Sequence, residues 1–321
     1  MSIEASVLNY ILRKYVKSIK KSPEESSYKD ARRLMNQKGY EDKNQNIVSK
    51  ILLKKIFRKK KSSIKVEELY LNQVRTLKFD FDKSDKKKCI LYFHGGGYVA
   101  GSPETHQNFL ISLCKKSEID IYAIDYALAP ENPFPAAIND AVESLEVLIE
   151  IGYESKNIII GGDSAGGNLA LVSILKLQEL KKLLPSKVFL LSPWTDLTAS
   201  GDSIKYNSKK DPYLSYDDFL STQKSMIQAA KDWYAPNQNH KNQMISPVFG
   251  HYESFPNTLI QVSDIEILFS DSINLAKKLK QNNNKVKLSI YKNLPHVWQI
   301  FGFLPEAKKA VNEIAFFLNQ Q

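Results

Sequence analysis

One serine of the chain stands in a setting that favours nucleophilic chemistry. Residues 162–166 have the form G-x-S-x-G, with Ser164 at the centre. They follow an apolar run, residues 157–161, and precede a long helical pattern, which places the serine on a sharp turn between a strand and a helix. The free N–H groups and the dipole at a helix start favour developing negative charge. The pattern therefore predicts that Ser164 is a nucleophile.

A glycine-rich loop upstream offers groups that could stabilise an oxyanion. The apolar residues 90–93 are followed by a His-Gly-Gly-Gly sequence. Consecutive glycines are conformationally costly, and they suit a backbone that must come close to a ligand and present bare N–H groups. We predict donors at Gly96 and Gly97, with Gly95 as an alternative. The residue after the nucleophile, Ala165, should supply a further N–H.

His296 is the candidate general base among the five histidines. It lies on a loop after the strand-like residues 286–291, which agrees with the chain order serine, acid, histidine. His94 belongs to the glycine loop and is expected to be structural. The other histidines stand in polar or turn-rich surroundings and are expected at the surface: His106, His240 and His251.

The acid of such a triad has several candidates. Residues 259–262 are typical of a strand, so the segment that follows should carry the acid. That segment contains Asp264, Glu266 and Asp271. A carboxylate there would orient the imidazole and stabilise the imidazolium. The residues alone leave the choice open.

Further motifs stand in the order found in one known family. The chain resembles the hormone-sensitive-lipase family of bacterial esterases, within the α/β-hydrolases, from about residue 65 to the C-terminus. The resemblance implies an α/β-hydrolase fold, with a mostly parallel central sheet flanked by helices and an N-terminal helical cap. It also implies a serine carboxylesterase for short-to-medium acyl esters. The motifs that carry it are residues 94–98, 101–106, 125–131, 133–137, 162–167, 192–197 and 295–298.

The resemblance also bears on the acid. Family members usually carry an Asp-Pro-Leu or Glu-x-Leu sequence thirty residues before the base, and Glu266-Ile267-Leu268 fits that frame. We therefore favour Glu266 and keep Asp264 in reserve. Ala127 stands where the family commonly has arginine, so we expect a surface ion pair to be missing, and Ser263 replaces a common glycine.

The remaining motif residues have open roles. His94, Gly95 and Asp163 belong to the two glycine motifs, and three aromatic residues could line an acyl pocket or belong to the core: Tyr98, Trp194 and Trp298. No metal or organic cofactor is expected. Acyl transfer or amide deacylation could use the same triad. A non-catalytic ligand-binding receptor is disfavoured, because the related plant gibberellin receptors lack the triad histidine and His296 is present here.

Strand-like runs alternate with helical patterns along the 321 residues, as a parallel sheet with crossover helices requires. We assign residues 1–64 to an N-terminal helical cap segment and 65–321 to the catalytic domain, with the cap completed by part of 200–245. Predicted strands are 66–71, 74–79, 88–93, 119–124, 158–161, 188–191, 259–262 and 286–291, the first two antiparallel. Predicted helices are 106–116, 135–149, 165–184, 216–228, 268–281 and 306–319.

The N-terminal segment is apolar and basic. Apolar residues recur at helical spacing from Ile3 to Ile19, and a second basic amphipathic stretch covers residues 47–57. We favour a cap over the acyl pocket, with peripheral membrane contact as the alternative. Despite the net charge of +10, no nucleic-acid partner is expected, because the lysines are spread along the chain. Two cysteines form no disulfide framework, and we expect a cytoplasmic protein with a small-molecule ester substrate and a homodimer as an option.

Overall fold

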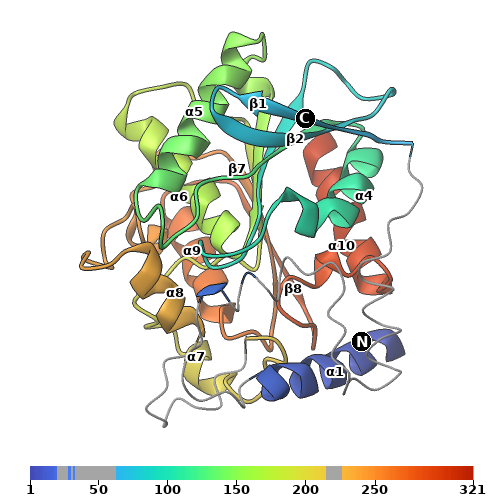
Figure 1. Cartoon of the computed structure of the whole chain (residues 1–321), viewed down its shortest axis with the longest axis vertical. Helices are drawn as coiled ribbons and strands as arrows, with labels where there is room; N and C mark the ends of the chain where they lie inside the picture. The colour runs from blue at the N-terminus through green and yellow to red at the C-terminus, as the bar shows by residue number, and fades with distance from the viewer. Residues whose placement is uncertain (20–27, 30–31, 33–62, 215–225, 321) are drawn as a thin grey trace.

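An eight-stranded sheet forms the centre of the computed structural model, which describes residues 1–19, 28–29, 32, 63–214 and 226–320 (Figure 1). The strand order is β1-β2-β4-β3-β5-β6-β7-β8. β1 and β2 pair antiparallel at one edge, and β2 is antiparallel to β4, while the other neighbours run parallel. The predicted, mostly parallel sheet is confirmed. The strands are β1 Lys65–Leu71, β2 Val74–Asp80, β3 Cys89–Phe93, β4 Asp120–Ile124, β5 Ile158–Asp163, β6 Lys187–Leu191, β7 Asn257–Ser263 and β8 Val286–Tyr291.

Helices cover both faces of the sheet, as Figure 1 shows for α4 and α10 on one side and α5, α6 and α9 on the other. Strands buried on both faces are mostly apolar, and the central strands β3, β4 and β5 are buried at every residue, including the carboxylates at their ends, Asp120 and Asp163. The helices are α1 Ile3–Ile19, α4 Gln107–Ser117, α5 Ala136–Glu150, α6 Ala165–Glu179, α7 Ser203–Tyr206, α8 Met226–Tyr234, α9 Phe269–Gln281 and α10 Pro305–Asn319.

Two helices differ from the sequence prediction. α6 ends at Glu179 and not near residue 184, because Lys181 adopts φ +53° and the Lys182 N–H donates to the Leu177 carbonyl, which closes the helix. Of the helix predicted over 216–228, residues 216–225 lie outside the described residues, and α8 continues to Tyr234.

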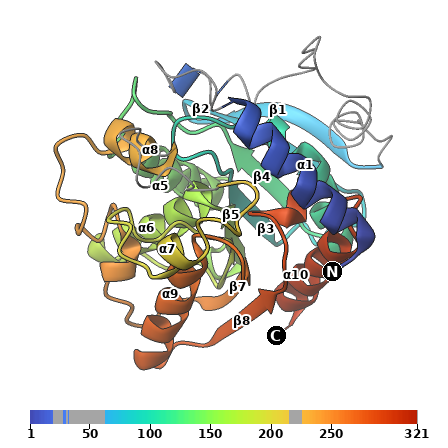
Figure 2. The ribbon, with the colours of Figure 1, turned by 90° about the horizontal axis from the view of Figure 1, so that it is seen from below.

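The N-terminal helix α1 packs beside the start of α10, as Figure 2 shows. Leu8 and Leu12 are buried in a cluster with Trp298, whereas Ile3 is 81% exposed and Val7 42% exposed. No helix among the described residues is long and apolar enough to cross a bilayer. The second basic stretch, 47–57, lies outside the described residues, so the membrane alternative stays a prediction.

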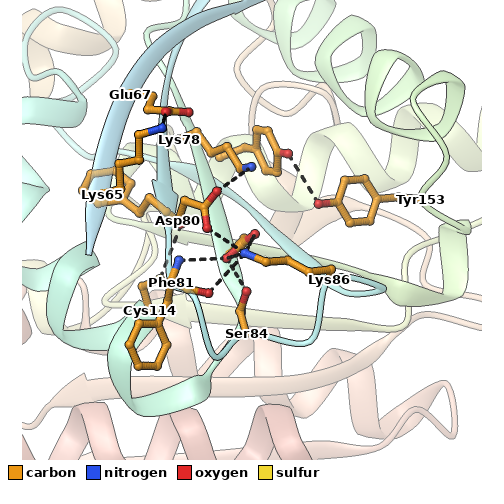
Figure 3. Close-up of polar contacts among 12 residues, drawn as sticks. Lys65, Glu67, Lys78, Asp80, Phe81, Ser84, Lys86, Cys114 and Tyr153 are labelled. Atoms are coloured by element: carbon orange, nitrogen blue, oxygen red, sulfur yellow. Dashed lines mark hydrogen bonds and ion pairs between the residues drawn. The ribbon is translucent and has the colours of Figure 1, made fainter. Parts of the chain in front are cut away.

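A buried carboxylate closes the amino-terminal end of the sheet. Asp120, the first residue of β4, lies 2.9 Å from the Lys86 ammonium and accepts hydrogen bonds from the Ser84 hydroxyl at 2.5 Å and the Phe81 N–H at 3.2 Å. Figure 3 labels these three partners, Phe81, Ser84 and Lys86. Lys86 also pairs with Asp80 at 2.6 Å. These contacts fasten the connection between β2 and β3 to β4.

We expect Asp120→Asn to lower the free energy of unfolding by about 1–3 kcal/mol, because the amide cannot satisfy all three donors and the lysine loses its buried counter-charge. Urea unfolding followed by circular dichroism measures the change. The control is Asp202→Asn, since Asp202 is exposed. Unfolding midpoints that agree for the two variants would show that the Asp120 cluster adds nothing to stability.

Candidate active site

Ser164 occupies a strained turn between β5 and α6. Its backbone has φ +52° and ψ −119°, and its N–H donates to the Leu191 carbonyl at 2.9 Å. A Cβ atom on Gly162 would lie 2.2 Å from the Gly166 carbonyl oxygen, and one on Gly166 would lie 2.0 Å from the Phe93 carbonyl oxygen. A side chain at either flanking position would clash with a backbone carbonyl group, so both positions require glycine. The turn presents Ser164 at the carboxyl end of the sheet.

The glycine loop follows β3 and lies against the start of α6. Gly96 has φ +126° and Gly97 has φ +64°, and a Cβ on Gly96 would lie 2.0 Å from the Ala100 carbonyl oxygen. On the other side, a Cβ on Gly97 would lie 3.1 Å from that of Ala230 in α8. Ala165 begins α6, so its N–H has no acceptor within the helix. The backbone thus offers N–H groups from two segments near Ser164.

Three aromatic residues flanking these loops are buried. Tyr98 stacks on Tyr234 of α8 with ring centroids 3.7 Å apart, and its hydroxyl donates to Asn168 at 2.7 Å. Trp194 is part of the core on the α6 face, and Trp298 belongs to the cluster under α1. Each therefore fills protein interior around the site.

His296 and Glu266 form a buried pair on neighbouring loops. Nδ1 of His296 lies 2.6 Å from a carboxylate oxygen of Glu266. The other oxygen accepts the Ser192 hydroxyl at 2.8 Å and the Ser263 N–H at 2.7 Å. The ring of Tyr213 stacks on the imidazole at 6.3 Å between centroids. The carboxylate therefore fixes the orientation of the ring and leaves Nε2 for chemistry.

The electrostatics of the pair favour a protonatable base. Burial disfavours the imidazolium, but the hydrogen bond and charge of Glu266 outweigh burial and raise the pKa of His296. The Asp211 carboxylate and then that of Asp163, the residue before Ser164, raise the pKa of His296 further. Burial raises the pKa of Glu266, and the His296 hydrogen bond partly opposes that shift. The loops after β5, β7 and β8 therefore converge at one end of the sheet.

The other candidate acids serve backbone groups. Asp264 accepts the Asn293 N–H at 2.8 Å. Asp271 is buried and accepts the N–H groups of Thr195 at 2.7 Å and Asp196 at 2.8 Å, while burial raises its pKa to about 8. Of the three carboxylates, Glu266 is the one that contacts His296.

The remaining histidines divide into buried and surface groups. His94 stacks on Tyr126 at 4.3 Å, and burial lowers its pKa to about 4, so it is neutral and structural. His251 is exposed and His240 is half-buried. The prediction of a surface position for His106 is wrong, because it is 3% exposed and contacts Asp163. The polar residues next to His106 in the sequence indicated a surface position, but its side chain points into the interior near Tyr92 of β3.

The sequence also gave no signal for Arg32. Its guanidinium forms two hydrogen bonds with Glu131, at 2.6 and 2.9 Å, and donates to the Val99 carbonyl at 2.7 Å and the Ala129 carbonyl at 2.9 Å. At Ala127, the position where an arginine was expected, the backbone N–H donates to Asp140. An arginine of the N-terminal segment thus pairs with the loop that follows β4.

The chain is similar to known proteins over most of its length. Residues 90–300 match the family described as alpha/beta hydrolase fold. This chain is an α/β-hydrolase of the hormone-sensitive-lipase family. An esterase of Acinetobacter venetianus is 34% identical to it over 231 residues, covering 72% of this chain and 74% of the relative. An acetyl-hydrolase of Streptomyces hygroscopicus is 29% identical over 232 residues, covering 72% and 75%.

Solved structures extend the similarity to the whole chain. An esterase from the bacterial hormone-sensitive lipase family superposes on this α/β-hydrolase with a TM-score of 0.86 and 29% identity, covering 100% of this chain and 99% of the other. A hormone-sensitive lipase from a metagenome library gives a TM-score of 0.84 and 30% identity, covering 99% and 97%.

We expect Glu266→Gln in this α/β-hydrolase to lower kcat on the order of 10³–10⁴-fold, because an amide cannot stabilise the imidazolium and favours the wrong tautomer. Asp264→Asn is the matched control and should stay within a few-fold of wild type, since its carboxylate serves a backbone N–H. Steady-state ester hydrolysis measures both. Similar losses of kcat in the two variants would contradict the assignment of Glu266 as the acid that orients His296.

Proposed function

We propose that the protein is a serine carboxylesterase in which Ser164 is the nucleophile, His296 the general base and Glu266 the acid that orients it. The chain is a carboxylic ester hydrolase by family. The observation that carries the finer assignment is the buried 2.6 Å contact between His296 and Glu266 at the sheet end where the strained turn presents Ser164.

The reaction proceeds through an acyl-enzyme. Nε2 of His296 takes the hydroxyl proton as Oγ of Ser164 attacks the ester carbonyl. The tetrahedral intermediate collapses, the bond to the alcohol oxygen breaks, and His296 returns the proton to that oxygen. Water then attacks the acyl-enzyme with His296 again as base, and the carboxylic acid leaves as the serine hydroxyl is regenerated. Glu266 stays ionised and keeps Nδ1 protonated throughout.

Backbone N–H groups stabilise the charge that develops in each step. Gly96 and Gly97 supply donors from the loop after β3, and Ala165 supplies one from the start of α6. Their positive φ values and close contacts fix the two glycines before substrate binds. Donors fixed in advance require no reorganisation during the reaction, which makes such a site effective.

The substrates we propose are short-to-medium acyl esters. Two features support a restricted acyl site. First, α8 packs directly on the glycine loop that carries the proposed oxyanion donors (residues 94–98, the oxyanion loop), through Ala230 on Gly97 and Tyr234 on Tyr98. Second, one relative is an acetyl-hydrolase. A covered site is better suited to binding a compact acyl group than to binding at a broad lipid surface.

We also propose that residues 1–64 act with part of 200–245 as a cap on a catalytic domain of residues 65–321. Arg32 bonds to the Val99 carbonyl, and Tyr28 packs edge-on against Trp233 of α8 at 5.9 Å, so the two parts of the cap touch each other beside the oxyanion loop. Peripheral membrane contact, a homodimer and a cytoplasmic location remain predictions.

Hydrolysis of p-nitrophenyl esters from acetate to palmitate tests the function. We expect wild-type turnover to be highest at short chains and Ser164→Ala to lose on the order of 10⁶-fold in kcat, as removal of a triad serine does. Trapping of the acyl-enzyme by mass spectrometry would identify the nucleophile. Wild-type-like turnover in Ser164→Ala would overturn the assignment, and a folded wild type that hydrolyses no ester would favour a non-catalytic receptor or a narrow acyltransferase.

A further inference from the structure

We propose that Asp163 and His106 form a buried, fully charged pair that positions the oxyanion loop against the nucleophile turn. The inference rests on the proposed esterase function, since it concerns the same oxyanion hole. Both side chains are positioning residues, because they act through Gly95 and the backbone of Ser164 and touch no reacting atom. The sequence motifs contain both residues without assigning either a role.

The Asp163 carboxylate joins two loops that must keep a fixed relation. Asp163 ends β5 and directly precedes Ser164. One of its oxygens accepts the Tyr92 hydroxyl at 2.6 Å and the Gly95 N–H at 3.0 Å. Gly95 is the residue before the two glycines proposed as oxyanion donors. The side chain of Asp163, the residue before Ser164, therefore holds in place the loop whose N–H groups must face Ser164.

There is no room for a side chain at position 95, where the backbone meets the Asp163 carboxylate. A Cβ atom on it would lie 2.2 Å from the Asp163 carboxylate. Its φ is not in the left-handed region, so the requirement for glycine comes from this close approach. The fit shows that the loop backbone rests directly on the carboxylate.

Hydrogen-bond partners at both ring nitrogens indicate that His106 is an imidazolium. Nε2 lies 3.2 Å from the Asp163 carboxylate. Nδ1 lies 2.8 Å from the Thr105 hydroxyl oxygen, whose own proton goes to the Ser102 carbonyl at 2.6 Å. Nδ1 is also 3.3 Å from that carbonyl, which can only accept. Each nitrogen thus has an acceptor within hydrogen-bond distance, an arrangement that the doubly protonated ring satisfies at both nitrogens.

The surrounding charges support the same state. Burial disfavours the imidazolium, but Asp163 outweighs it and raises the pKa of His106. Burial likewise opposes ionisation of Asp163, and His106 outweighs it and lowers the pKa of that carboxyl. The other titratable groups facing the ring are Tyr92 of β3 and His94 of the glycine loop, which is neutral. The pair is lost only when pH rises through the folded pKa of His106 or falls through that of Asp163.

A purely structural reason for this pair is weak. A buried ion pair often contributes no more stability than well-packed apolar residues of similar volume. An unpaired carboxylate beside the oxyanion loop would oppose the negative charge that the loop must stabilise. The imidazolium cancels that charge while the carboxylate keeps its hydrogen bond to Gly95. The pair therefore provides an anionic anchor for the loop without an anionic field at the oxyanion.

Two variants separate charge from hydrogen bonding. His106→Gln retains an amide donor in place of Nε2 but leaves Asp163 without its counter-charge, and we expect kcat to fall on the order of 10²-fold, the size of a lost oxyanion donor. KM should stay within about threefold, because substrate binding precedes charge development. The double variant His106→Gln/Asp163→Asn is neutral and can re-form the side-chain contact, so it should recover at least about tenfold of that loss.

The matched controls are His251→Gln and Asp202→Asn, which alter exposed residues and should leave kcat unchanged. Affinity for an alkyl boronic acid, which mimics the tetrahedral intermediate, should fall in parallel with kcat in His106→Gln. A kcat for His106→Gln within threefold of wild type, or a loss confined to KM, would overturn the positioning role.

The protonation state can be read in the wild type without any kinetic measurement. ¹H–¹⁵N correlation of the histidine rings at pH 8, with His106→Gln used to identify the signals, should show both His106 nitrogens protonated. A neutral ring at that pH would overturn the ion pair. Absence of ester hydrolysis in the wild type would instead overturn the proposed function, while the ring spectrum would still decide whether the pair is charged.

Discussion

The close contact between the start of α6 and the end of β3 is the constraint on which the site depends. A Cβ on Gly166 would fall 2.0 Å from the Phe93 carbonyl oxygen and 2.6 Å from that of His94. The glycine loop proposed to bind the oxyanion starts at that histidine, so this loop and the turn that carries Ser164 share a backbone contact. Two segments about seventy residues apart are therefore registered by main chain and not by flexible side chains. That registration suits catalysis by fixed dipoles.

Two buried histidine–carboxylate pairs lie near this contact, and their partners explain why they differ. His296 meets Glu266 through Nδ1, so the carboxylate leaves its other nitrogen available for the role of general base proposed above. His106 has acceptors at both nitrogens and is held in one protonation state. A general base must gain and lose a proton in every turnover, whereas an anchor works only if its charge is constant. The same two residue types thus serve opposite needs through their hydrogen-bond partners.

The sequence predicted the sheet well because buried strands carry short continuous apolar runs, and each run from β3 to β8 was found within two residues at either end. It could not choose the acid from residues alone, since Asp264 and Glu266 both follow β7 and only the conformation of that turn decides which one meets His296. It missed the inward position of His106 because the partner, Asp163, is 57 residues away. Arg32 was missed for the same reason, with acceptors 67 to 99 residues distant.

The N-terminal segment reaches both halves of the proposed machinery. α1 buries Leu8 in the cluster that contains Trp298, two residues after His296. Arg32 bonds to the carbonyl of Val99, two residues after the last oxyanion glycine. The base loop and the oxyanion loop are therefore each supported by the same stretch of chain, although neither contact supplies a reacting group. A segment that rests on both loops can transmit a change in its own packing to both of them together, and this would give the proposed cap a structural role besides covering an acyl group.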